Sequence, residues 1–419
     1  MAYVQFITSD NQRFVDSLDY IYLVRSNSLY LHKLSDYRDW FYNTPISVSF
    51  NFYFLHSDET VRQDLTPYLL EGGQLTINNE NGVRRKLSIE LSNREHWISS
   101  PVSGFLWKGS KFKLEICVKS ASAECVYPAG IFLLNEFEMP HSHTNNKISI
   151  ELIDKFGGLD GTVGGKIVDA LYIGRNSNIK QVILGLLNGE RVAGERYEFK
   201  TIMFPIEYEN ETTPFTISKS ADSNSSIGEV IKELVEIINL NVYYDVYGRM
   251  CFSEKSENVL TNMKPSIWEF CDEDYYYESP SMRVEMQSVV NVVMVQGANI
   301  NGSIVNTTAK NVNPKSPTNI SVFEPTMCRI VDENISSTSS AQARANYELF
   351  KRSLLPLSVT FNTMVVPMID VDEVVSITDS YYKFRQTRFL INSISIPIST
   401  VPKMKMSVTN LEEVAFNGR

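Results

Sequence analysis

Hydrophobic and polar side chains alternate along much of the first 155 residues of the chain. In residues 46–54 every second position is Ile, Val or Phe, and most positions between them are polar. The same period of two recurs in residues 87–91, 112–118 and 148–152. A period of two places alternate side chains on opposite faces of a strand, so these stretches predict half-buried antiparallel strands. Because long open strand edges promote aggregation, we expect a closed or nearly closed β structure.

A hairpin and a change of pattern mark the limits of this first region. Asn81 and Gly82 stand between two strand-like runs, and this pair tolerates the positive φ angles of a tight turn. From about residue 156 glycines become frequent, and helical spacing follows in residues 179–186. Ser226 and Glu229 form a capping box before a second amphipathic run. We therefore predict a first tube-like β-barrel domain at 1–155 and a small α+β domain at 156–280.

The remaining residues, 281–419, predict a second tube-like β-barrel region. Residues 289–297 are largely β-branched and predict a buried strand, and the polar stretch of about 35 residues after them predicts a long loop. A helix near 339–355 follows, ended by Pro356, with Ala343, Tyr347, Phe350 and Leu354 on one stripe. The predicted fold class is mainly β with an α+β insert.

The segment IDVDE, residues 369–373, raises the question of an acid or metal site. A period of two would place Ile369 and Val371 on a buried strand face, and Asp370 and Asp372 together on the opposite face. Two aspartates can contribute to a cation site, but the further oxygen ligands are not indicated nearby. We interpret them as the solvated face of a barrel strand that packs against the predicted helix stripe, and expect Asn at both positions to be tolerated.

No other motif predicts chemistry. A phosphate loop needs glycine where Asp160 stands and a hydroxyl where Ile167 stands, so residues 157–166 are interpreted as a turn. His141 and His143 lack a third zinc ligand at matching spacing. We assign no catalytic, cofactor-binding or metal-binding residue and expect no enzyme and no cofactor. A glycosidase stays open as a class, because its two carboxylates leave no local signature, and the 21 Tyr and 22 Phe could line a sugar groove.

Composition limits the classes of partner and the cellular compartment that we expect for this protein. The formal net charge of −10 lacks the basic surface of a duplex-DNA-binding protein. Five cysteines without CxxC spacing indicate reduced thiols rather than a disulfide scaffold. The N-terminus lacks a secretory signal pattern, and no apolar run is long enough to span a membrane.

Several of these stretches together resemble the phage baseplate hub family, which includes the late control protein D type and tail-associated hub proteins. The most specific part is C-terminal: a helix with Ala341, Ala345 and Leu349, then Pro367 and the run 369–375, then a closing strand at 388–399. Residues 225–252 resemble the helix, strand, Asp-x-x-Gly turn and strand of the family, and residues 82–93 resemble its first-barrel hairpin.

The resemblance implies a structural protein of the virion, assembled in the host cytoplasm. It implies a homotrimer whose two barrels per chain form a pseudo-sixfold ring. The ring would connect the sixfold tail tube, or a distal tail protein, to a threefold spike or tip fibre protein, with a tape measure protein as a further candidate partner. DNA would pass through its channel without specific binding, in agreement with the acidic net charge. The alternative is a cell-wall polysaccharide-binding or -degrading β protein of the tail tip.

Overall fold

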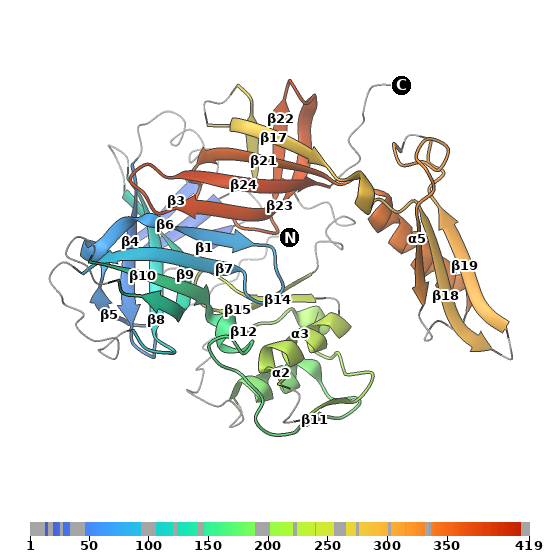
Figure 1. Ribbon diagram of the computed structural model, residues 1–419, viewed down its shortest axis with the longest axis horizontal. Coiled ribbons are helices and arrows are strands. Elements are labelled where there is room, and N and C mark those ends of the chain that lie inside the picture. The colour runs from blue at the N-terminus through green and yellow to red at the C-terminus, as the bar shows by residue number, and fades with distance from the viewer. Residues whose placement is uncertain are drawn as a thin grey trace.

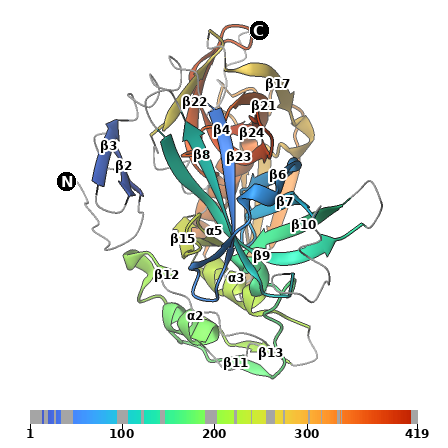
Figure 2. The same ribbon diagram turned by 90° about the vertical axis from the view of Figure 1, so that its left-hand side faces the viewer.

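The chain builds one large β-sheet, a smaller α+β unit and a projecting arm (Figure 1). The computed structural model describes residues 13–15, 20–25, 28–33, 47–93, 106–119, 124–140, 146–188, 202–220, 224–238, 240–254, 265–273, 276–300, 303–314, 316–331, 335 and 337–411. Near the N-terminus a small antiparallel sheet lies apart from the large one (Figure 2). Its strands are β1 (Arg13–Val15), β2 (Tyr20–Arg25) and β3 (Ser28–Lys33).

The large sheet has 13 strands, drawn from both ends of the chain. The N-terminal part contributes β4 (Ser47–Leu55), β5 (Val61–Asp64), β6 (Leu69–Asn78), β7 (Arg85–Ser92), β8 (Lys111–Lys119), β9 (Glu124–Glu138) and β10 (Lys147–Asp154). The later part contributes β16 (Trp268–Cys271), β17 (Glu278–Val284), β21 (Leu357–Met364), β22 (Val374–Asp379), β23 (Phe384–Pro397) and β24 (Lys403–Asn410). The strand order is β17-β21-β24-β23-β6-β7-β10-β9-β8-β4-β5, with β22 paired to β23 and β16 paired to β22.

The pairing of β6 with β23 joins the two strand-rich regions into one sheet. Ile77 lies opposite Ile394 in this antiparallel pair, and Leu75 lies opposite Ile396. All four side chains are buried in a single hydrophobic core that also contains Phe52 and other residues of both regions. The predicted fold class, mainly β with an α+β insert, is confirmed. The two predicted barrel regions are thus continuous in the structure, with a common sheet and a common core.

The middle unit has its own core and lies below the large sheet in Figure 1. It contains α2 (Ile179–Asn188), α3 (Ile227–Ile237), β11 (Leu171–Ile173), β12 (Ile202–Met203), β13 (Ile217–Lys219), β14 (Leu240–Tyr244) and β15 (Met250–Glu254). The predicted capping box is confirmed: Ser226 Oγ accepts the N–H of Glu229 at 3.1 Å, and the Glu229 carboxylate accepts the N–H of Ser226 at 3.0 Å. These two bonds satisfy N–H groups that a helix start leaves free.

The arm, residues 289–355, projects to the side of the large sheet in Figure 1. It contains β18 (Val292–Ile300), β19 (Ser303–Lys310), β20 (Met327–Val331) and α5 (Thr338–Ser353), and its strand order is β19-β18-β20. The prediction of a long loop after residue 297 was therefore wrong, because β19 and β20 lie within that polar stretch. In β19 the exposed positions include Asn306, Thr308 and Lys310, so composition alone concealed this strand.

The predicted contact face of α5 was also wrong. Ala341 and Ala345 are fully buried and Leu349 packs beside them, whereas Phe350 is 60% exposed. The side chains of Ala343 and Tyr347 lie outside the described part. The helix packs on β18 and β19 and not on residues 369–377. Small alanine side chains allow the close approach of helix and sheet that the larger residues would prevent.

Short 3-10 helices connect several strands, namely η1 (Thr66–Tyr68), η2 (Lys155–Gly158), η3 (Ile206–Tyr208) and η5 (Met286–Ser288). Of the helices that the structure describes, none combines the length and the apolar character needed to cross a bilayer.

The common core predicts a common unfolding transition. Replacing Ile394 by Ala removes buried methyl groups opposite Ile77, and we expect a loss of about 2–5 kcal/mol in the free energy of unfolding. Both strand-rich regions should still unfold together in urea, as followed by circular dichroism and tryptophan fluorescence. The control Ile206→Ala, at an exposed site, should change little. Two separate transitions, of which only one shifts, would contradict a shared core.

Candidate functional site

Two consecutive arginines, Arg84 and Arg85, lie where the large sheet meets the rest of the chain. They follow the turn between β6 and β7, in which Gly82 has a φ of 105° that glycine adopts without strain. Arg84 is 2% exposed and Arg85 is completely buried. A buried guanidinium group is tolerated only when its charge and its N–H groups find partners. The partners of these side chains therefore determine which segments pack here.

The first partner is Asp154, at the end of β10. Its Oδ2 atom accepts hydrogen bonds from the backbone N–H groups of Arg84 and Arg85, at 2.7 and 2.9 Å. Its Oδ1 atom accepts the N–H of Phe156 at 3.0 Å and thereby caps η2. One buried carboxyl group thus fixes the hairpin backbone relative to the segment that leads into the middle unit.

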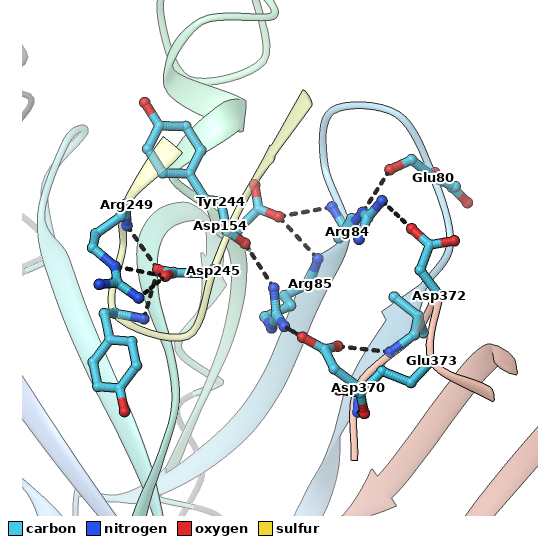
Figure 3. A network of polar contacts seen from close by, with 12 residues as sticks. Glu80, Arg84, Arg85, Asp154, Tyr244, Asp245, Arg249, Asp370, Asp372 and Glu373 are labelled. Atoms are coloured by element: carbon cyan, nitrogen blue, oxygen red, sulfur yellow. Dashed lines mark hydrogen bonds and ion pairs between the residues drawn. The ribbon is translucent and has the colours of Figure 1, made fainter. Parts of the chain in front are cut away.

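The side chain of Arg84 connects the hairpin to the C-terminal region (Figure 3). Its Nη2 atom lies 2.5 Å from Oδ2 of Asp372, a residue 288 positions later in the chain. Its Nε atom donates to the backbone carbonyl of Glu80 at 3.1 Å. The guanidinium carbon lies 3.6 Å from the centre of the Tyr243 ring, a cation–π distance. Arg84 therefore contacts the middle unit as well as the C-terminal region.

Arg85 makes the same two connections with different atoms. Its Nη1 atom donates to the backbone carbonyl of Tyr244 in β14 at 2.7 Å, and its Nη2 atom pairs with the carboxylate of Asp370. The hairpin, the middle unit and the C-terminal region thus meet in one buried network. We call this network the arginine junction, and its charged members are Arg84, Arg85, Asp154, Asp370 and Asp372.

Backbone contacts of the hairpin reinforce the arginine junction. The N–H of Gly82 donates to the carbonyl of Val242 at 2.8 Å, and Oδ1 of Asn81 accepts the N–H of Val242 at 2.8 Å. On the other side, the N–H of Asn79 donates to the carbonyl of Asn392 in β23 at 2.7 Å. The hairpin turn is therefore held between β14 and β23.

The prediction for IDVDE was wrong. Asp370 and Asp372 do not lie on a solvated strand face, because β22 begins only at Val374 and both carboxylates pair with buried arginines. Asp372 has a positive φ of 65°, and the carboxylate of Glu373 accepts the N–H of Asp370 at 2.8 Å. The segment is a turn, and its alternating pattern arises because Ile369 and Val371 still point into the core.

A second buried charge connects the large sheet to the middle unit. Lys155 is 4% exposed, and its Nζ atom lies 2.5 Å from Oε1 of Glu59 and 2.9 Å from the carbonyl of Gly248. Lys111 approaches the same carboxylate at 3.4 Å. Gly248 closes the predicted turn after Asp245, with a φ of 71°. The turn is therefore confirmed, and it also serves as a docking point.

Burial and charge act in opposite directions on the pKa values of these groups. Burial raises the pKa of Asp154 to about 6, although hydrogen bonds from Arg85 and Arg84 and the charge of Arg85 counteract it. Burial opposes the charged form of Arg85, but the surrounding acidic groups, Asp370 first and then Asp154 and Asp245, together outweigh burial, so the pKa of Arg85 is raised. Burial lowers the pKa of Lys155 despite the adjacent Glu59. Asp154 is thus a group of the arginine junction that titrates close to neutral pH.

The other candidates from the sequence do not form a ligand site in the described residues. The N–H groups of Ile227 and Gly228, at the start of α3, donate to the carbonyls of Gly165 and Leu159. Carbonyl groups of the glycine-rich turn at 157–166 therefore already occupy two N–H groups at the start of α3, where a helix could otherwise hold an anion. His141 and His143 lie outside the described residues. Within the described ranges, no group of three or more His, Cys, Asp or Glu side chains is arranged to hold a metal ion.

Removing the counter-charges should destabilise the protein. The double variant Asp370→Asn/Asp372→Asn leaves both buried guanidinium groups without their acidic partners, so we expect a loss of about 3–5 kcal/mol in the free energy of unfolding. Urea denaturation measures this loss. The control Asp169→Asn, at an exposed aspartate, should leave the midpoint unchanged. A double variant as stable as the control would contradict the role of the arginine junction.

The raised pKa of Asp154 predicts a pH dependence with a defined sign. The folded state holds the Asp154 proton more tightly than the unfolded chain, so this contribution is complete below about pH 4 and is lost as the pH rises through about 6. Asp154→Asn removes the titration and lowers stability at every pH, since an amide cannot accept hydrogen bonds at both ends. The stability difference between wild type and variant should therefore decrease from pH 4.5 to 7.5. A difference that increases over this range would show the opposite pKa shift.

Comparison with solved structures identifies proteins of similar overall fold. The tail protein from Neisseria meningitidis MC58 matches 86% of this chain over 97% of its own length, with a TM-score of 0.56 and 9% identity. The 43 kDa tail protein of prophage MuSo2 from Shewanella oneidensis matches 87% over 98% of its own length, with a TM-score of 0.54 and 10% identity. A chain of the lidded Francisella PdpA–VgrG complex matches 92% over 56% of its own length, at a TM-score of 0.56 and 9% identity.

No protein-family model and no curated protein sequence matches the chain. At 9–10% identity the structural matches establish the fold and not the family. Over 86% and 87% of its length, respectively, this chain shares its fold with these two tail proteins.

Proposed function

We propose that this protein is a structural hub of a phage-type tail tip. Three copies would form a ring that connects the sixfold tail tube to a threefold spike or tip and forms part of the DNA channel. The observation that carries the proposal is the match over nearly the entire length of two tail proteins, 97% and 98%. A match to one common domain would leave other roles equally open, whereas these two matches also cover 86% and 87% of this chain.

The large sheet, which joins both strand-rich regions of the chain, supports the symmetry of the proposed ring. Each chain supplies two strand-rich regions, joined by β6 and β23 and held at a fixed orientation by the arginine junction. Three rigid chains then present six similar regions to a sixfold tube and three similar faces to a spike. A flexible connection between the two regions would not keep six equivalent positions in register with a sixfold tube. In this proposal the buried ion pairs hold the two regions rigid.

The charge of the chain supports passage of DNA rather than binding. A net charge of −10 repels phosphate, and a channel lined by basic residues would retain DNA through salt-dependent contacts. In this proposal the chain has no enzymatic activity and no cofactor. Its partners are a tail tube or distal tail protein above, a spike or tip fibre protein below, and a tape measure protein. The protein would act in the virion, after assembly in the host cytoplasm.

Mass and shape in solution test the proposal directly. Native mass spectrometry should give three times the 47.7 kDa of one chain, and negative-stain class averages should give a threefold ring with a central channel. A monomer whose melting temperature rises with cell-wall polysaccharide would overturn the hub and favour a sugar-binding tail protein. A ring with six copies would instead favour a tube or distal tail component.

A further inference from the structure

The arm has one sheet face that no described element covers. Val293 and Val295 of β18 face α5 and pack on Ala341 and Ala345. The opposite face carries the alternate positions of the three strands. Strand register places on this open face Met294, Gln296, Ile304, Asn306, Thr308, Lys310, Met327, Arg329 and Val331. Among the described elements, α5 is the one that packs extensively on the arm sheet.

The open face carries exposed apolar side chains on both of its edge strands. Met327 is 60% exposed, Val331 is 58% exposed and Ile304 is 47% exposed. Both edge strands, β19 and β20, lack a further pairing partner among the described strands. Exposed apolar side chains beside unpaired strand edges are typical of an interaction surface, because soluble proteins usually protect such features.

The charge of the arm identifies the kind of surface that it fits. Residues 289–355 contain six basic and four acidic residues, whereas the rest of the chain contains 33 basic and 45 acidic residues. Two of the basic side chains, Lys310 and Arg329, lie on the open face itself. A cationic arm on an acidic body is complementary to a second copy of the same chain, since opposite charges at different places on one molecule favour head-to-tail contacts.

A matching acidic surface lies on the outer face of β9 and β10. Glu136 lies opposite Glu151, and Glu138 lies opposite Ser149, so the three carboxylates share the face that points away from the core. All three are exposed, and a lysine of the same face, Lys147, pairs with Glu90 rather than with them. The pKa of Glu151 is raised by partial burial and by the charge of Glu136, in agreement with a local excess of negative charge.

We propose that the open face of the arm docks on the acidic β9–β10 face of the neighbouring copy in the ring. Met327, Val331 and Ile304 supply the apolar contact area, while Arg329 and Lys310 pair with Glu136 and Glu151 of the next copy. A head-to-tail contact of this kind closes into a ring when repeated by rotation. The inference rests on the proposed hub function, since it names the surface that holds the copies of the hub together.

Charge reversal and charge exchange test the proposal. The arm variant Lys310→Glu/Arg329→Glu should raise the dissociation constant of the assembly by at least about tenfold, because like charges then face each other. The body variant Glu136→Lys/Glu151→Lys should weaken assembly in the same way. A protein with all four changes restores the opposite charges and should assemble within about threefold of wild type. Analytical ultracentrifugation at low and moderate salt measures each value.

Two body arginines provide the matched control. Arg175→Glu/Arg283→Glu changes the net charge as much as the arm variant, at exposed sites outside the arm. This control should assemble like wild type, and thermal unfolding should show that every variant is folded. If the arm variant also assembles like wild type, the proposed docking surface is wrong, but the proposed hub function is not contradicted. Weakened assembly without rescue by the four changes overturns the acidic β9–β10 face as the receptor. If the wild-type protein is a monomer at all concentrations, the hub itself fails.

Discussion

The burial of two adjacent guanidinium groups is the constraint on which the arrangement of this protein depends. Moving a charged group from water into a core costs several kcal/mol, so Arg84 and Arg85 are acceptable inside the protein only if partners converge on them. Those partners come from β10, from β14 and from the turn before β22. The native position of the hairpin is therefore fully stabilised only when the middle unit and the C-terminal region are both in place.

Local features were predictable because their physical cause lies within a few residues. The capping box of Ser226 and Glu229 and the turn ending at Gly248 depend on neighbours in sequence, and both are confirmed. The alternation in residues 46–54 likewise reflects one buried face of β4. The arginine junction was missed because its ion pairs join residues 285 and 288 positions apart. The sequence did contain one signal. Arg84 and Arg85 stand directly after a tight turn, at positions where the next strand should already be buried.

The IDVDE segment shows why periodicity alone can mislead. Apolar residues at every second position also occur in a turn when Ile369 and Val371 anchor it to the core. Pattern therefore identified the buried side chains correctly and their secondary structure incorrectly. For α5, the choice between two stripes depended on side-chain size, and the alanine stripe was the one that allowed close packing on β18 and β19. The spacing of residues in the sequence does not tell how closely a helix approaches its sheet. It therefore could not decide between the alanine stripe and the stripe of larger side chains.

The pairing of β6 with β23 has a consequence for synthesis of the chain on the ribosome. Thr76 of β6 pairs with Ser395, so this edge stays uncovered until the chain has been translated as far as β23. Until then β6 presents free N–H and C=O groups beside an incomplete core, which is the state most prone to association with other nascent chains. A polypeptide released before β23 is made therefore keeps this edge of β6 open. Chaperones that bind extended segments during translation would therefore have the most time to bind at this edge of β6.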